Sequence, residues 1–395
     1  MFPFTRQEKV ARLAEYITKG SARPYTAELH LAHRCNLRCR FCAMQDNRYQ
    51  PKRPLPPDGW RRLVERLAEM GVKEWRLGGG LGEVLCAPEL FLDLAAVIKQ
   101  NGGHGWLTTN GTLFSERVTK RLIELNWDRI EFSLDGATAA THDMLRGVPG
   151  AYDALIRAVR AFSEARHAQG TATELILHTV ITSANQPELP GLVTLAAGLG
   201  VDGIFFEPVA PVSDNARELV IDPAAPAFRA AHAEAMQRAE SQGTATNLAA
   251  LITAEPGTTG AADVGAGCPA ALQMSFGRTI FPGGDCSPAM VALWRRLPLV
   301  TRRWIVLGAR CFEPFYGLAV RVDGTVQPCC SAALHAAAPA DILHFWRGSM
   351  MKKLRRKLLR DFDERICARC MPSIIEKTNG LRADLDRFLE NQPPW

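Results

Sequence analysis

The sequence lacks the features that mark membrane and secreted proteins. No window of the 395 residues approaches about 18 uninterrupted apolar residues, so no membrane-spanning helix is expected. The first residues, MFPFTRQEKVARL, contain no apolar core followed by small residues at a cleavage site, so no secretory signal is expected either. These absences predict a cytoplasmic protein without a membrane partner.

Compositional extremes and internal repeats are also missing. Glycine (32) and proline (25) are ordinary in number, and 47% of the residues are hydrophobic, which is enough for a large core. The net charge of +6 is mild, and much of it falls between Lys352 and Arg360. We expect this basic run to be the solvated face of a helix, because true nucleic-acid patches are rare by comparison.

Cysteine, by contrast, is plentiful. The eleven cysteines are Cys35, Cys39, Cys42, Cys86, Cys268, Cys286, Cys311, Cys329, Cys330, Cys367 and Cys370. In a reducing compartment, clustered cysteines favour metal binding over disulfides. An odd count also argues against a framework in which every cysteine is paired.

Residues 25–210 alternate between short apolar runs and longer helical patterns. Strands are expected at Thr26–Leu31, Glu74–Leu77, Gly105–Thr109, Arg129–Leu134, Glu174–Ile181 and Gly203–Pro208, and helices at Pro57–Met70, Ala87–Gln100, Ser115–Leu125, Tyr152–Gln169 and Glu188–Leu199. Six consecutive β/α units imply a parallel sheet. The predicted fold class is therefore α/β, a partial (β/α)6 TIM-like barrel whose chemistry lies at the carboxyl ends of the strands.

The remaining residues divide into three further regions. Residues 1–24 are expected to form an N-terminal helix, and residues 211–300 a bridge or lid with one helix at Ala224–Ser241. Residues 301–395 are expected to form a small C-terminal α+β iron–sulfur domain. It contains a hairpin at Gly317–Pro328 with Asp323-Gly324 at the turn, then a basic helix and a Cys-x-x-Cys.

The first cysteine cluster is Cys35, Cys39 and Cys42, in a loop directly after the first expected strand. A cubane [4Fe-4S] cluster needs a ligand on each of its four irons. Three thiolates leave one iron open, and an open iron can bind the amino and carboxylate groups of S-adenosylmethionine (SAM). The alternative is a tetrahedral zinc site with His33 as the fourth ligand, although zinc ligands usually come as two close pairs.

The spacing Cys-x3-Cys-x2-Cys, with the aromatic Phe41 before the last cysteine, resembles the signature loop of the radical SAM superfamily. The resemblance implies a SAM-binding [4Fe-4S] cluster held by three cysteines and a flavodoxin- or ferredoxin-type electron donor. It also implies reductive cleavage of SAM to a 5′-deoxyadenosyl radical, which abstracts a hydrogen atom from the substrate. In such an enzyme the cofactor carries the radical chemistry, and the protein supplies ligation and orientation.

Further segments after the expected strands resemble the same family. The residues that the resemblance assigns to SAM are Phe41, Gly80, Gly82, Glu83, Thr109, Asn110, Ser133, Asp135, Arg146, His178 and Glu207. Gly82-Glu83 resembles the family's Gly-Glu-Pro motif with Val84 in place of proline, and Glu83 is expected to hold the SAM ammonium. Without the resemblance, this glycine-rich stretch would be a simple strand-to-helix turn.

The resemblance implies that Ser133 and Asp135 face the ribose and methionine end of SAM. It also implies that Arg146 pairs with the methionine carboxylate, a task suited to a guanidinium fork. The plain alternative for Arg146 is a surface salt bridge. His178 could equally be a satisfied core histidine, and Glu207 is expected to touch adenine or substrate.

The second cysteine set is Cys311, Cys329, Cys367 and Cys370. Four thiolates suit a fully ligated [4Fe-4S] cluster or, on spacing alone, a zinc ribbon. The stretch from Cys311 to Cys370 resembles the SPASM/twitch extension of radical SAM enzymes, which implies an auxiliary cluster of the shorter twitch form. Cys330 could substitute for Cys329. Plain buried thiols are the default expectation for Cys86, Cys268, Cys286 and Cys330. Cys268 or Cys286, in the expected bridge, could instead complete the auxiliary cluster.

Three enzymatic hypotheses follow. The first is oxidation of a small carbohydrate- or aminocyclitol-like substrate, with the auxiliary cluster taking the second electron. The second is epimerisation, with Cys268 or Cys286 as the hydrogen donor. The third is peptide modification, placed lower because only about 24 residues precede the first strand and many peptide maturases of the family begin with a peptide-binding domain. A non-enzymatic electron carrier or zinc-stabilised binding protein is the remaining alternative.

Overall fold

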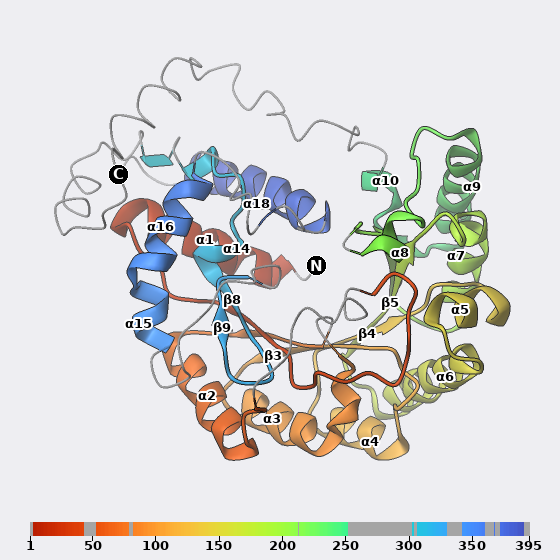
Figure 1. The fold of residues 1–395 in the computed structure, drawn as a ribbon, viewed down its shortest axis with the longest axis horizontal. Helices are drawn as coiled ribbons and strands as arrows, with labels where there is room; N and C mark the ends of the chain where they lie inside the picture. The colour runs from red at the N-terminus through yellow and green to blue at the C-terminus, as the bar shows by residue number, and fades with distance from the viewer. Residues whose placement is uncertain are drawn as a thin grey trace. The chain divides into compact units, whose positions relative to one another are not determined.

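The computed structural model describes residues 3–42, 53–78, 82–211, 213–251, 302–303, 306–329, 342–359, 367 and 372–390 (Figure 1). The chain divides into two compact units. We call them the terminal unit (Met1–Glu28, Glu65–Glu74 and Thr258–Trp395) and the central unit (Leu29–Val64 and Trp75–Gly257). The domain boundaries expected near residues 25, 211 and 301 stay predictions.

The described strands belong to a single sheet. They are β1 (Thr26–Leu29), β2 (Glu74–Leu77), β3 (His104–Thr109), β4 (Arg129–Ser133), β5 (Glu174–Ile181), β6 (Gly203–Pro208), β7 (Ala245–Thr246), β8 (Gly317–Val320) and β9 (Val326–Gln327). Their order in the sheet is β7-β6-β5-β4-β3-β2-β1-β8-β9. The pairs β3–β4, β4–β5, β5–β6 and β6–β7 are parallel. The fold class is therefore α/β with a parallel sheet, as the alternating sequence pattern predicts.

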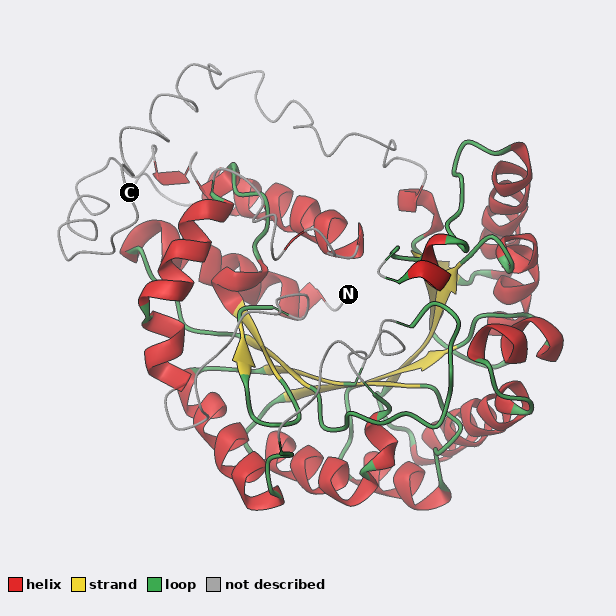
Figure 2. Ribbon diagram, in the orientation of Figure 1, coloured by secondary structure: helices red, strands yellow, loops and turns green. Residues whose placement is uncertain are grey.

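Helices connect the parallel strands of the central unit. They are α3 (Pro88–Gln100), α4 (Glu116–Glu124), α5 (Ala139–Arg146), α6 (Ala151–Gln169), α7 (Leu189–Gly198), α8 (Asp214–Arg217), α9 (Pro226–Gln242) and α10 (Leu248–Leu251), with 3-10 turns η2 (Val84–Cys86) and η3 (Gln186–Glu188). Helix α2 (Pro57–Met70) precedes β2. Figure 2 shows the helices α3, α4, α6 and α7 on one side of the strands, as expected for β/α units.

The boundaries of two of these helices follow from local hydrogen bonds. The Ser115 hydroxyl accepts from the Val118 N–H at 3.3 Å and begins α4. The Thr138 hydroxyl accepts from the Thr141 N–H at 3.3 Å and begins α5. Side-chain oxygens at this position satisfy N–H groups that a helix leaves without a partner. Helix α5 ends at Gly147, which adopts the left-handed conformation with φ 70°.

The side of β4 that faces the helices is apolar. Ile130 and Phe132 are 0% exposed. The Phe132 ring meets Phe114 edge-on at 4.9 Å between centroids, and Phe114 in turn meets Phe162 of α6 at 5.8 Å. This layer buries the strand's apolar face against its helices, where each large side chain contributes about 1.5–3 kcal/mol by leaving water.

The opposite side of the same strands is polar. Arg129 donates to Glu131 at 2.5 Å and to Glu174 of β5 at 2.9 Å. Its guanidinium carbon also lies 4.1 Å from the centre of the Trp106 ring on β3. A parallel sheet covered by helices on both faces would carry aliphatic side chains here. This sheet carries a buried layer of paired charges instead. This face is therefore built for polar contacts.

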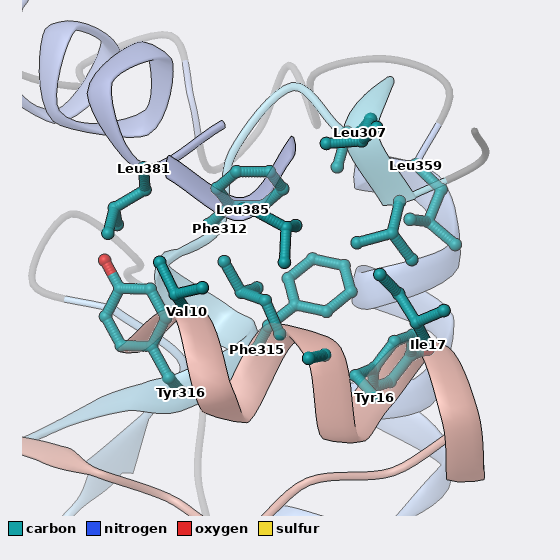
Figure 3. Packing of buried hydrophobic residues seen from close by; sticks show 14 of the residues in the cluster. Val10, Tyr16, Ile17, Leu307, Phe312, Phe315, Tyr316, Leu359, Leu381 and Leu385 are labelled. Carbon is teal, nitrogen blue, oxygen red and sulfur yellow. The ribbon is translucent and has the colours of Figure 1, made fainter. Parts of the chain in front are cut away.

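The terminal unit packs helices from both ends of the chain around one apolar cluster. Its elements are α1 (Pro3–Lys19), α14 (Glu313–Tyr316), the β8–β9 hairpin, α15 (Ile342–Arg347), α16 (Ser349–Leu358) and α18 (Pro372–Glu390). Figure 3 shows Phe315 between Tyr16 of α1 and Leu385 of α18. The Tyr16 and Phe315 rings meet edge-on at 4.8 Å.

A buried ion pair joins α1 to the start of β2 within the terminal unit. The Lys9 ammonium donates to both oxygens of Glu74, at 2.7 and 2.9 Å. The two side chains are only 1% and 4% exposed. The Thr26 hydroxyl donates to the same carboxylate at 3.3 Å. Removal of one partner would leave an uncompensated buried charge, so the pair fixes how α1 packs.

Several expected elements of the C-terminal region are confirmed. Strands β8 and β9 pair antiparallel, and Gly324 at the turn has φ 80°. In the basic helix α16, Met351 and Leu358 are buried while Lys352, Lys353 and Lys357 are exposed, which confirms a solvated face for the lysines; Arg355 of the same run is buried. No helix among the described residues is long and apolar enough to cross a membrane.

Candidate functional site

The loop after β1 carries the first three cysteines. Cys35, Cys39 and Cys42 are all partly exposed. The Cys42 N–H donates to the Cys39 carbonyl at 3.1 Å, which closes a tight turn between the two thiols. The Leu37 N–H and the Asn110 side-chain amide point at the Cys35 sulfur from 3.4 and 3.8 Å. Burial raises the pKa of Cys35 to about 11, and the Leu37 N–H opposes this rise because a donor directed at sulfur favours the thiolate.

The C-terminal end of α5 holds this loop through the backbone. The Arg38 N–H donates to the Arg146 carbonyl at 3.0 Å, and the Arg40 N–H donates to the Leu145 carbonyl at 2.9 Å. Gly147 lies so close that a Cβ there would be 2.3 Å from the Arg38 carbonyl oxygen. The helix end therefore binds the residues that lie between the cysteines.

The Arg146 side chain is buried between a carboxylate and a thiol. Its Nε lies 2.7 Å from Asp135 Oδ2, and its Nη1 lies 3.6 Å from Cys39 Sγ. The guanidinium carbon is 5.7 Å from the centre of the Phe41 ring. Burial disfavours the charge, but the Asp135 carboxylate and the Cys39 sulfur outweigh it, so the pKa of Arg146 is raised.

Asp135 is the fully buried centre of this arrangement, with 0% exposure. Its Oδ1 accepts from the Val180 N–H of β5 at 2.9 Å, while Oδ2 faces Arg146. The Asp135 N–H donates to His142 Nδ1 at 3.1 Å. Burial, and then the charge of Arg146, lower the pKa of His142 to about 3, so this imidazole is neutral.

Glu83 links the loop after β2 to the loop after β3. The Thr109 hydroxyl, the Asn110 N–H and the Leu85 N–H donate to its carboxylate at 2.7, 2.8 and 3.1 Å. Its own N–H donates to the Arg34 carbonyl at 3.0 Å. Glu83 is 4% exposed, and burial raises its pKa against the three hydrogen bonds. Glu83 therefore holds the backbone of Arg34, the residue before Cys35, in place.

Asn110 and Asn36 add hydrogen bonds between the loop after β3 and the cysteine loop. The Asn110 amide donates to Asn36 Oδ1 at 3.0 Å, and the Asn36 amide donates to the Thr112 hydroxyl at 2.6 Å. The sequence identifies Thr109 and Asn110 through the resemblance alone. In the structure Asn110 contacts the cysteine loop directly, and Thr109 donates to Glu83, whose N–H bonds to Arg34.

Ser133, His178 and Glu207 lie on the polar side of neighbouring strands. Ser133 is in register with His178, and Val180 is in register with Glu207. His178 Nε2 lies 3.4 Å from Glu207 Oε2. Burial lowers the pKa of His178, but the hydrogen bond to Glu207 and the charges of Glu131, Glu207 and Asp135 outweigh it, so the pKa is raised. His178 thus has a carboxylate partner at the strand ends.

Sequence reasoning missed the neighbours of this pair. Phe205 lies in register with His178, with ring centroids 5.5 Å apart, and Glu131 lies one layer below Ser133 on β4. The signal was present in the alternation Arg-Ile-Glu-Phe-Ser of β4, where every second residue is polar.

Part of the expected site lies outside the described residues. This applies to Gly80, Cys268, Cys286, Cys330 and Cys370. Cys311, Cys329 and Cys367 are partly buried and pack against the apolar cluster of the terminal unit. Over the described ranges, no three His, Cys, Asp or Glu side chains are arranged to hold a single metal ion. A cubane makes a different demand, because each thiolate binds its own iron.

Comparison with known families agrees with these two cysteine regions. Residues 29–184 match the radical SAM superfamily, and residues 311–371 match the SPASM iron–sulfur cluster-binding domain. The chain therefore carries a radical SAM domain followed by a SPASM domain. A radical SAM domain implies a [4Fe-4S] cluster and SAM, and a SPASM domain implies auxiliary iron–sulfur clusters.

The chain is similar to curated proteins of different activities. An AdoMet-dependent heme synthase of Methanosarcina barkeri is 29% identical over 174 residues, 44% of this chain and 47% of that protein. A PqqA peptide cyclase of Xanthomonas campestris is 29% identical over 181 residues, 46% of this chain and 46% of that protein. The chain thus spans about half the length of the curated relatives it matches.

Among solved structures, the fold is similar to Streptococcus suis SuiB. The TM-score is 0.59 at 14% identity, and the match covers 89% of this chain and 72% of that chain. At this identity the likeness shows the fold alone.

Proposed function

We propose that this chain is a peptide-modifying radical SAM enzyme whose Cys35, Cys39 and Cys42 hold the SAM-cleaving cluster. The observation that carries the cluster assignment is the set of N–H donors around two of the thiols. Leu37 and Asn110 donate toward Cys35, and Arg146 donates toward Cys39. Donors in such number suit the sulfurs of an anionic iron–sulfur cluster, so the residues present fit the group.

When bound, the cluster and SAM together supply hydrogen-atom abstraction. This chain's residues position that chemistry. Glu83 and Asn110 brace the cysteine loop, and Arg146 binds it from α5. We assign Ser133, His178 and Glu207 to the polar wall that faces SAM or substrate, and Cys311, Cys329, Cys367 and Cys370 to an auxiliary cluster. A flavodoxin- or ferredoxin-type protein would supply the electron.

The substrate class is the point at which the comparisons change the expectation. The sequence favoured oxidation of an aminocyclitol-like molecule over peptide modification. The relatives support the lower-ranked reading, because one is named a peptide cyclase and SuiB has a crystal structure bound to its precursor peptide SuiA. The number of residues before the first strand is a weak guide to substrate, because a peptide can also bind to the polar face of a sheet.

The test is the formation of 5′-deoxyadenosine by the anaerobically reconstituted, reduced chain. We would compare a panel of synthetic peptides with a panel of aminocyclitols. We expect peptides to accelerate 5′-deoxyadenosine formation and to emerge with altered mass. Acceleration by aminocyclitols alone would overturn the peptide assignment and restore small-molecule oxidation. Absence of 5′-deoxyadenosine from wild type under every condition would overturn the enzyme assignment itself.

A further inference from the structure

Arg146 makes more contacts with the cysteine loop than a partner for the SAM carboxylate requires. Its carbonyl accepts from the Arg38 N–H at 3.0 Å, and its Nη1 lies 3.6 Å from Cys39 Sγ. Its side chain is 9% exposed, and the Asp135 side chain that it meets is 0% exposed. A buried guanidinium held on one side by a carboxylate has little freedom to leave the thiol.

We propose that Arg146 is a positioning residue that sets the reduction potential of the cluster through its hydrogen bond to the Cys39 sulfur. This inference rests on the proposed function, in which Cys35, Cys39 and Cys42 are the ligands. It goes beyond that function because it assigns a redox role to a residue that does not bind iron.

The physical argument concerns charge. Reduction adds one negative charge to the cluster and its thiolates. A cationic N–H donor at a ligand sulfur stabilises the reduced state more than the oxidised one, which raises the potential. Burial strengthens this effect because electrostatic interactions are weakly screened there. The Asp135 carboxylate, 2.7 Å from Arg146 Nε, offsets part of it.

Asp135 orients the guanidinium. Its Oδ2 holds Nε at 2.7 Å, and its Oδ1 is tied to the Val180 N–H at 2.9 Å. The carboxylate is thus anchored to β5, and the Nη1 atom is left directed at Cys39. Without this anchor, the long arginine side chain would lose rotamer entropy to hold the same geometry.

The experiment is an EPR-monitored redox titration of the full chain without SAM. The cluster of interest is identified as the signal that changes on SAM addition and is absent from a Cys35/Cys39/Cys42→Ala variant. We expect Arg146→Gln to keep this signal and to lower its midpoint potential. Arg40→Gln is the matched control, because it removes a positive charge from the same loop, and the exposed Arg40 side chain donates to Met144 Sδ at 3.3 Å and not to a cysteine sulfur. Its potential should stay at the wild-type value.

An unchanged potential in Arg146→Gln with full iron content would overturn the inference and leave the proposed function intact. A SAM-responsive signal that persists in the triple cysteine variant would instead overturn the ligand assignment. If Arg146→Gln does not fold, the hydrogen bond can still be tested in the wild-type chain. Pulsed EPR of protein grown with ¹⁵N-arginine detects arginine nitrogens close to the reduced cluster. We expect a weak ¹⁵N coupling to the reduced cluster that is lost in Arg146→Lys, and its absence from wild type would contradict the hydrogen bond.

Discussion

At the scale of single residues, Gly82 is one position where the backbone admits no side chain. It has φ 119°, and a Cβ there would lie 2.5 Å from the Ala32 carbonyl oxygen and 3.0 Å from that of Arg34. Gly82→Ala must therefore displace the backbone that leads to Cys35. We expect a loss of unfolding free energy above about 2 kcal/mol, more than strain alone would cost. Thermal unfolding of the apo chain and its iron content after reconstitution would measure this.

Gly150→Ala is the control for that substitution. Gly150 also has positive φ, at 81°, but nothing lies within 4 Å of its ideal Cβ. Its cost should be backbone strain alone, about 1–2 kcal/mol, with normal iron uptake. Equal losses of unfolding free energy and equal iron contents in Gly82→Ala and Gly150→Ala would contradict a role for the close approach of Gly82 to the Ala32 carbonyl.

The buried His142 makes the stability of the folded chain depend on pH. Its pKa falls from an ordinary 6.5 to about 3 in the folded chain. Below pH 6.5 the unfolded state takes up a proton that the folded state refuses, so stability is lost as the pH falls toward about 3. The slope from this group is at most about 1.4 kcal/mol per pH unit.

The matched variant is His142→Asn, whose side-chain oxygen can still accept from the Asp135 N–H but does not titrate in this range. We expect the thermal midpoint of wild type to fall more steeply between pH 6.5 and 5 than that of the variant. Parallel pH profiles would mean that His142 is not a buried neutral histidine.

The sequence can propose candidate site residues but not the contacts between them. The spacing of Cys35, Cys39 and Cys42 is local, so it can be read without a structure. The partners of Glu83 cannot, because Asn110 lies 27 residues away and its N–H meets the carboxylate only after β3 has paired. For the same reason the sequence places Arg146 beside SAM and does not anticipate its contact with Cys39, 107 residues away.

At the scale of elements, substitutions in helix α18 can test the apolar cluster of the terminal unit. Leu385 is 0% exposed and packs with Phe315 and Leu381 (Figure 3). We expect Leu385→Ala to cost about 2–5 kcal/mol of stability, because it leaves a cavity among helices. Cys311 and Cys367 pack against the same cluster, so less iron should be retained in the terminal unit.

Phe388 offers a control on the same helix. It is 36% exposed, so Phe388→Ala should change the stability by about 0.5 kcal/mol or less. Thermal unfolding and iron analysis of both variants would check this. A Leu385→Ala protein with wild-type stability and iron content would contradict the role of α18 in the cluster.

The elements that the sequence predicts well are those with a clear period. The expected ranges Glu74–Leu77, Glu174–Ile181 and Gly203–Pro208 are the observed β2, β5 and β6. Helix α5 was missed, because its eight residues are too few for an apolar period and its Thr138 cap lies in a glycine- and alanine-rich stretch. Helix α18 was missed as well, although its apolar side meets α1 from the other end of the chain.

At the scale of the whole molecule, the two cysteine regions predict the domain order that the family matches confirm, 29–184 followed by 311–371. The substrate class could not be predicted in the same way. We propose that it depends on side chains such as His178, Phe205 and Glu207, which meet only when β5 and β6 are paired in register. Their chemistry is visible in the folded chain but not in any short stretch of sequence.

The most direct test of the account is iron content, with EPR spectra, after anaerobic reconstitution of wild type and the Cys35/Cys39/Cys42→Ala variant. We predict that the variant loses the SAM-responsive signal and keeps about 4 Fe per chain as a cubane in the SPASM domain. A variant that keeps the SAM-responsive signal, or that binds zinc in place of iron, would contradict the account.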